Sequence, residues 1–248
     1  MCRLIAAAVL AAGTLGGPAQ ADDAATAVLD KAVKALGGED KLGKVAAFSY
    51  DAKGTVSVMG NDSDVVLKAT YQGIDHMRQE IDLKFGGMDV KGFTVLAKDK
   101  GWRKFGGMGG ALEGGDLENT KRIAYLGIVP VLVTPLKGNG FKVESGGEEK
   151  VGEKPAAVLK VTGPEGKPFT LSFDKETGLP AKLTATVLGF TGEEIKQETT
   201  YSDYKDKDGI KKATKIESKR DGQKYMTLTV GSFKVLDKVD PKTFTEPD

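Results

Sequence analysis

The segment MRQEIDLKF, residues 77–85, decides the fold class because its polarity alternates with a period of two. Its apolar residues occupy odd positions: Met77, Ile81, Leu83 and Phe85. Its charged residues occupy even positions: Arg78, Glu80, Asp82 and Lys84. Successive side chains of a β-strand point to opposite faces of the sheet. The segment therefore predicts an antiparallel strand with one apolar face and one face in water.

The same alternation recurs on both sides of this segment. It is found at 65–71 and 93–97, and turn signals separate the runs at 60–62, 86–87 and 98–101. Further strands are expected at 141–151, 156–161, 169–173, 181–188, 195–204, 210–218 and 223–236. This pattern predicts roughly ten or eleven strands, too many for a flat sheet, so the sheet is expected to curl around something.

The last predicted strand contains a change of register. Met226, Leu228 and Val230 are even-numbered, whereas Phe233 and Val235 are odd-numbered, with Gly231 between the two sets. A β-bulge at Gly231-Ser232 would keep all five apolar side chains on one face.

Two helices are expected in addition to the sheet. Leu29, Ala32, Val33 and Leu36 form one apolar stripe, and Gly37-Gly38 ends that helix. A second helix is expected from Asp116, as N-cap, to about Val133, and Pro130 should kink or end it. The glycine-rich residues 106–115 before it are interpreted as a loop that interrupts the sheet. The predicted fold class is α+β: a strongly curved antiparallel half-barrel wrapped around the N-terminal and central helices.

Residues 1–21 have the pattern of an export signal: a basic start with Arg3, a small-residue apolar stretch and a small-x-small ending at Ala21. Cleavage there would leave a mature chain that begins at Asp22 and forms one domain, 22–248, in the periplasm. The whole chain has a formal net charge of +1. No basic footprint for nucleic acid is present, and no segment is a good transmembrane helix.

The residue types that most reactive sites need are scarce. The chain has one cysteine, Cys2, which would leave with the signal, and one histidine, His76. The glycine cluster lacks a Gly-Lys-Ser/Thr ending, no Gly-x-Ser-x-Gly elbow occurs, and the acids around Asp208-Gly209 lack calcium-loop spacing. We therefore expect no catalytic residue, metal or cofactor; a carboxylate pair acting as acid and base stays open as the least supported alternative.

Four stretches of the chain carry a resemblance to a known family. They are the opening helix with the strand after it, Tyr71 to Ile81 with Arg78, Ala97 to Trp102, and Leu236 to Phe244 with Asp240-Pro241. Together they resemble the LolA-like outer-membrane lipoprotein carriers and sorting proteins. The resemblance implies a half-barrel that holds acyl chains in an apolar concavity beneath a mobile helical lid, here about residues 106–136.

In the best-known carriers of that family a buried arginine latches the lid, and Arg78 is at the matching position. Strict alternation instead puts Arg78 on the polar face with Glu80, so a surface salt bridge is the favoured alternative. The glycines at 106–115 could hinge the lid, or they could form a flexible loop before a fixed core helix. Trp102, the only tryptophan, could line the cavity mouth or be an ordinary core residue.

The sequence thus favours a carrier or chaperone that binds a lipid, lipoprotein acyl chains or another apolar ligand. The residues expected to bind it are Ile81, Leu83, Phe85, Phe93, Val95, Trp102, Ile128, Val131 and Leu132. Its partners would be a lipid or a lipidated protein, with envelope membrane proteins as further candidates, and a monomer is expected. The alternative is a periplasmic protein-interaction or envelope-sensor domain that uses the same fold without lipid transport.

Overall fold

A computed structural model describes residues 22–246 except residues 59, 139 and 190. The predicted signal, residues 1–21, lies outside the described residues. In the described part of the chain, thirteen strands form one antiparallel sheet, in the order β6-β5-β4-β3-β2-β1-β13-β12-β11-β10-β9-β8-β7. Their bounds are β1 Ala47–Val58, β2 Asn61–Gln72, β3 His76–Phe85, β4 Met88–Ala97, β5 Lys100–Phe105, β6 Met108–Ala111, β7 Lys142–Val151, β8 Lys154–Thr162, β9 Pro168–Asp174, β10 Pro180–Leu188, β11 Glu194–Lys207, β12 Ile210–Arg220 and β13 Gln223–Leu236.

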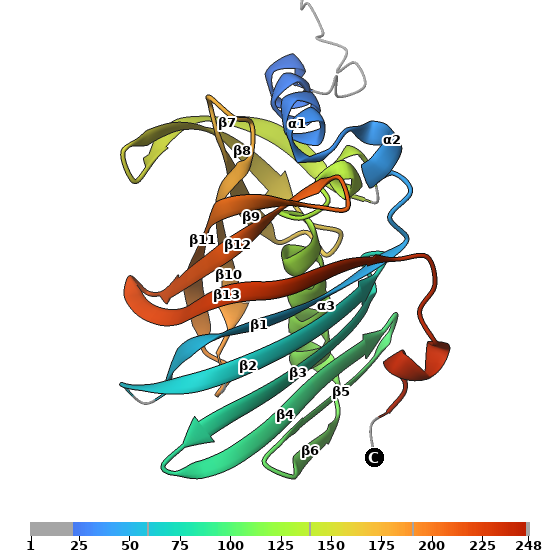
Figure 1. Cartoon of the computed structure of the whole chain (residues 1–248), viewed down its shortest axis with the longest axis vertical. Coiled ribbons are helices and arrows are strands. Elements are labelled where there is room, and N and C mark those ends of the chain that lie inside the picture. Colours follow the sequence, from blue (N-terminus) through green and yellow to red (C-terminus); the bar gives the residue numbers. More distant parts are fainter. Residues whose placement is uncertain (1–21, 59, 139, 190, 247–248) are drawn as a thin grey trace, which may run out of the picture.

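The sheet is strongly curved and open, and its two edge strands are β6 and β7 (Figure 1). The prediction of a curved antiparallel sheet is confirmed, but the predicted count of ten or eleven strands is too low. Sequential strands pair as hairpins except β6 and β7, which are the two edges, and β13 joins the two halves of the sheet by pairing with β1.

One strand that the sequence analysis did not predict, β6, lies in the glycine-rich segment. Residues 106–110 are not a loop: Gly106 and Gly107, with φ of 58° and 83°, form the two-residue turn of the β5–β6 hairpin. Such turns need positive φ at both central residues, which glycine adopts without steric cost. β6 was missed because glycine is a poor strand former. The glycines of this hairpin therefore belong to the sheet.

The bulge predicted in the last strand is present. Asp51 of β1 lies opposite Ser232, and the next residue, Ala52, lies opposite Val230, so Gly231 is the extra residue. Val230 and Phe233 are consequently both buried in the same core. The change in the parity of apolar residues was sufficient to locate this irregularity.

The helices are α1 (Asp23–Leu36), α2 (Glu39–Leu42) and α3 (Gly114–Ile128), with 3₁₀ turns η1 (Thr134–Lys137) and η2 (Pro241–Phe244). α1 buries the predicted stripe and ends at Gly37. α3 begins after an N-cap at Glu113 instead of Asp116. It ends at Ile128 because Pro130 has no N–H to continue the helical hydrogen bonds, although Val129 itself keeps helical φ and ψ of −59° and −30°.

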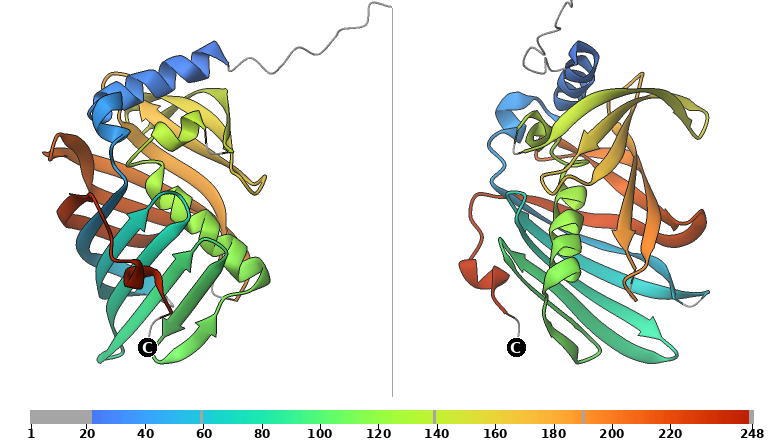
Figure 2. Two further views of the ribbon diagram at one scale, coloured as in Figure 1. Left: turned by 90° about the vertical axis from the view of Figure 1, so that its right-hand side faces the viewer. Right: turned by 180° about the vertical axis from the view of Figure 1, so that it is seen from behind.

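The two longer helices occupy different places. α3 crosses the hollow of the curved sheet, whereas α1 lies over one end of it, against β7, β8 and β12 (Figure 2). The main core fills the space on the concave side, between sheet and helices. A second, smaller core lies on the outer face, where the C-terminal segment covers β1 and β4; its buried residues are Ala47, Val95, Val239 and Phe244.

None of the helices in the described part of the chain is long and apolar enough to cross a membrane.

Candidate functional site

A cavity of about 240 Å³ lies between α3 and the concave face of the sheet. Side chains from both halves of the sheet and from α3 line it. Its apolar lining residues are Leu67, Ile81, Ile123, Leu126, Pro130, Val131, Leu183, Ala185, Val187, Ile216, Met226 and Leu228. Its polar and aromatic-hydroxyl lining residues are Tyr50, Tyr71, Gln79, Gln197, Thr199, Tyr201, Lys212, Ser218, Arg220 and Tyr225. The cavity therefore has apolar walls interrupted by polar groups.

The structure brings two of the nine expected binding residues to this cavity, Ile81 and Val131. Leu83, Ile128 and Leu132 are buried in the main core, outside the cavity lining. The side chain of Phe85 lies outside the described part of the molecule.

The remaining three residues, Phe93, Val95 and Trp102, lie on the outer face, so the prediction that they line the concavity is wrong. Directly opposed residues of antiparallel strands share a face, and Phe93 lies opposite Glu80 while Val95 lies opposite Arg78. Trp102 lies opposite Val95 and packs against the second core. The odd-numbered apolar residues of β4 share a face, as the alternation predicts, but it is the outer face, where Val95 packs against the C-terminal segment.

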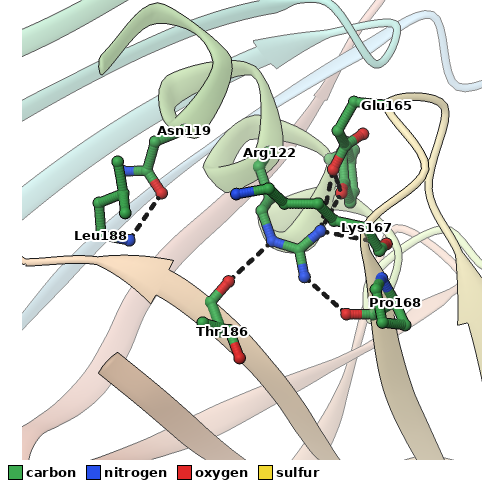
Figure 3. Close-up of polar contacts among 8 residues, drawn as sticks. Asn119, Arg122, Glu165, Lys167, Pro168, Thr186 and Leu188 are labelled. Atoms are coloured by element: carbon green, nitrogen blue, oxygen red, sulfur yellow. Dashed lines mark hydrogen bonds and ion pairs between the residues drawn. The ribbon is translucent and has the colours of Figure 1, made fainter. Parts of the chain in front are cut away.

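Arg122 of α3 is the most heavily bonded side chain near the cavity, and sequence reasoning missed it. Its side chain is only 2% exposed. Nε donates to the carbonyl of Thr186 at 2.8 Å, and Nη2 donates to the carbonyl of Pro168 at 2.7 Å. Nη1 donates to the carboxylate of Glu165 at 2.9 Å, and further to the carbonyl of Lys167 and the hydroxyl of Tyr125. Figure 3 shows this guanidinium among its acceptors.

Tyr125 and Asn119 provide further contacts between α3 and the sheet. The hydroxyl of Tyr125 donates to Glu165, and burial, followed by that bond, raises the pKa of Tyr125. One turn earlier, Asn119 accepts a 2.9 Å hydrogen bond from the backbone N–H of Leu188 on β10 (Figure 3). These contacts hold α3 to the β8–β9 turn and to β10.

The opposite flank of α3 is held more weakly. Lys121 pairs with Asp99 of the β4–β5 turn at 2.9 Å, and Arg103 of β5 donates to the hydroxyl of Thr120 at 3.2 Å. The charged side chains Lys121, Asp99 and Arg103 are partly or largely exposed, so such pairs contribute about 1 kcal/mol or less. α3 therefore spans the opening between the two halves of the sheet, with its stronger attachment on the β8–β10 side.

Arg78 has a different role from a lid latch. Its Nε donates to Glu80 at 2.7 Å, and its guanidinium lies 5.9 Å from the ring centroid of Phe93. Nη1 reaches the carbonyl of Thr243 at 3.4 Å. Arg78 thus lies on the outer face, as strict alternation predicts, and fastens the C-terminal segment. The nearby His76 contacts Asp75 and the ring of Phe244.

No group of three or more histidine, cysteine or carboxylate residues that could hold a metal ion occurs among the residues described.

No protein-family model matches the chain, and no curated protein sequence matches it. Solved structures do resemble it. A DUF1329 family protein from Desulfovibrio piger superposes with a TM-score of 0.57 at 13% identity, covering 89% of this chain and 97% of that one. A LolA superfamily protein from Nitrosomonas europaea superposes with a TM-score of 0.56 at 12% identity, covering 90% and 97%. The fold is LolA-like.

A domain assigned to the outer-membrane lipoprotein-sorting proteins, from Vibrio parahaemolyticus, also matches this LolA-like fold. Its TM-score is 0.52 at 9% identity, covering 87% of this chain and 97% of that one. The resemblance had implied a latch arginine that reaches from the sheet to the lid. In this LolA-like chain the buried arginine is on the helix itself, and its acceptors are on the sheet and its turns.

Proposed function

We propose that the protein is an exported periplasmic carrier or chaperone that holds a lipid, or the acyl chains of a lipidated protein, between α3 and the concave sheet. The observation that carries this proposal is the cavity of about 240 Å³ whose walls come from α3 and both halves of the sheet. Each methylene removed from water contributes about 0.8 kcal/mol, so a chain of several carbons gains useful affinity there.

Release would require α3 to move away from the sheet. Its weak attachment to the β4–β5 side leaves that flank free to open, while the Arg122 contacts act as a hinge on the β8–β10 side. The cavity is smaller than the roughly 300–1,000 Å³ of common ligand pockets, so opening of α3 would also enlarge it. On this proposal the protein binds and releases, and it catalyses no reaction.

Native mass spectrometry of the exported form, purified without detergent, tests the proposal. A bound mass that matches a lipid, released under activating conditions, is the expected result. Ala185 is 4% exposed and lines the cavity, so Ala185→Phe should fill part of the space and reduce that mass. Thr184→Phe is the matched control because Thr184, the adjacent residue of β10, points to the other face.

The second candidate is a protein-interaction or envelope-sensor domain with the same fold. The small cavity and the firm attachment of α3 by Arg122 favour it. Absence of any lipid mass together with a stable protein partner would reject the carrier and support this alternative.

A further inference from the structure

The charged residues of the cavity are all of one sign. Among the described residues that line it, Lys212 and Arg220 are charged, and no carboxylate is present. Both belong to β12, eight positions apart, which corresponds to about 26 Å along an extended strand. Lys212 is 4% exposed, whereas Arg220 is partly exposed, so Lys212 marks the buried end of the cavity.

Lys212 is unusual because a buried ammonium group normally has an anionic partner. Its Nζ lies 4.9 Å from the ring centroid of Tyr50, and within the described part of the chain it forms no salt bridge. Burial lowers its pKa to about 8, and no neighbouring acid opposes that shift. A lysine with this pKa is still mostly protonated near neutral pH.

The groups around Lys212 supply no negative charge. The tyrosines that share the cavity, Tyr50, Tyr71 and Tyr201, have pKa values that burial raises, so they stay neutral. Thr199 and Ser218, which hydrogen-bond each other at 2.9 Å, add uncharged hydroxyl groups nearer to Arg220. The closed end of the cavity is thus cationic, with neutral tyrosine side chains as its other polar groups.

Arg220 differs because it already has partners. Its Nε donates to Gln197 at 3.1 Å, and its guanidinium stacks 3.6 Å from the ring centroid of Tyr225. Between these two cations the wall includes the apolar residues Ile216, Met226 and Leu228, with hydroxyl groups beside them. This arrangement fits a molecule with one charged end and an apolar chain.

We propose that the ligand is a single-chain amphiphile whose anionic head group, a carboxylate or a phosphate, binds Lys212, while its chain lies along the apolar wall toward Arg220. This inference rests on the proposed carrier function and specifies its ligand. A head group there would supply the counter-charge that Lys212 lacks. Removal of one partner from a buried charge pair lowers affinity by about 30-fold or more.

Calorimetric titration of the delipidated, exported form tests this with three probes: decanoate, decyl phosphate and the neutral methyl decanoate. The variants are Lys212→Met, which keeps the length and removes the charge, and Lys212→Arg, which keeps the charge. Lys211→Met is the matched control, since Lys211 is exposed on the same strand. Circular dichroism and a thermal melt establish that each variant is folded.

The inference predicts that Lys212→Met weakens decanoate or decyl phosphate binding about 30-fold and leaves methyl decanoate unchanged, while the other two variants bind both anions normally. The anion that loses more affinity identifies carboxylate or phosphate as the head group. If Lys212→Met loses as much affinity for methyl decanoate as for the anions, or loses none for either anion, the inference is overturned. The carrier function is unaffected by that result. If none of the three probes binds the wild-type protein, the inference is also overturned, and the native mass measurement decides the carrier function separately.

Discussion

The Nε of Arg122 on α3 lies 2.8 Å from the carbonyl oxygen of Thr186 on β10. Four more hydrogen bonds complete the surroundings of this guanidinium, and three of its acceptors are backbone carbonyls. An arginine on the helix, bonded to main-chain atoms of the sheet, therefore determines where α3 lies. Substitution at the accepting residues would leave those carbonyls in place, so the interaction depends mainly on Arg122.

Replacement of Arg122 by methionine should lower the free energy of unfolding by about 3–5 kcal/mol, because Glu165 and the carbonyls would lose their buried partner. Urea denaturation measures the loss, and amide hydrogen exchange in α3 should accelerate. Arg103→Met is the control; since Arg103 is partly exposed, its loss should stay below about 1 kcal/mol. Equal costs for the two variants would contradict the role given to Arg122.

Stability should rise with pH between 8 and 10 because of Lys212. Its folded-state pKa is about 8 and its usual value is 10.5, so in this range the unfolded chain binds more protons. The free energy of unfolding should increase by about 2 kcal/mol over these two pH units. Above pH 10 buried tyrosines such as Tyr50 and Tyr204, whose pKa burial raises, reverse the trend, since only the unfolded tyrosines then lose protons.

The measurement for this prediction is a series of urea midpoints from pH 7 to 10 for the wild-type protein and Lys212→Met. The difference between the two should shrink as pH rises, because methionine carries no charge at any pH. A constant difference would mean that Lys212 is not buried as a cation.

Gly127 allows α3 to approach the sheet closely. A Cβ at this position would lie 2.6 Å from the hydroxyl oxygen of Tyr71, whereas a Cβ at Gly115 would have its nearest neighbour at 3.9 Å. Although alanine is the better helix former, Gly127→Ala should therefore destabilise the protein by about 1–3 kcal/mol. Gly115→Ala should be neutral or slightly stabilising, and thermal melts distinguish the two variants.

Trp102 should not respond to ligand in the cavity, because it packs on the outer face of the sheet. Its emission spectrum should stay unchanged during titration with decanoate in the wild-type protein. A tryptophan introduced at Leu183, which lines the cavity, should change its emission, with Trp102→Phe removing the background. A shift in the Trp102 signal alone would place the ligand elsewhere.

Alternation in the sequence predicted the strands better than it predicted the site. It fixed which residues share a face of β3, and the parity change in β13 located the bulge at Gly231. It did not reveal which face is concave, because the C-terminal segment buries Val95 on the outer face as α3 buries residues on the other. That covering depends on contacts between residues about 150 positions apart along the chain.

The sequence contains only weak indications that Lys212 and Arg122 are buried. Lys212 is an even-numbered residue of β12, like Ile210, Thr214 and Ile216. The alternation along this strand therefore indicates that Lys212 points to the inward face. Arg122 shares a helical face with Asn119 and Tyr125, at spacings of three, but nothing local identifies acceptors on β10 and the β8–β9 turn. Their positions depend on the curvature of the whole sheet.

The two edge strands of the open sheet affect how the protein behaves at high concentration. An unpaired strand edge is a template for intermolecular pairing. β6 is only four residues long, and β7 has a register shift between Ser145 and Glu148 and exposed charges that include Glu144 and Lys150. Neither edge offers a long, flat, uncharged surface, so the open half-barrel should resist edge-to-edge polymerisation.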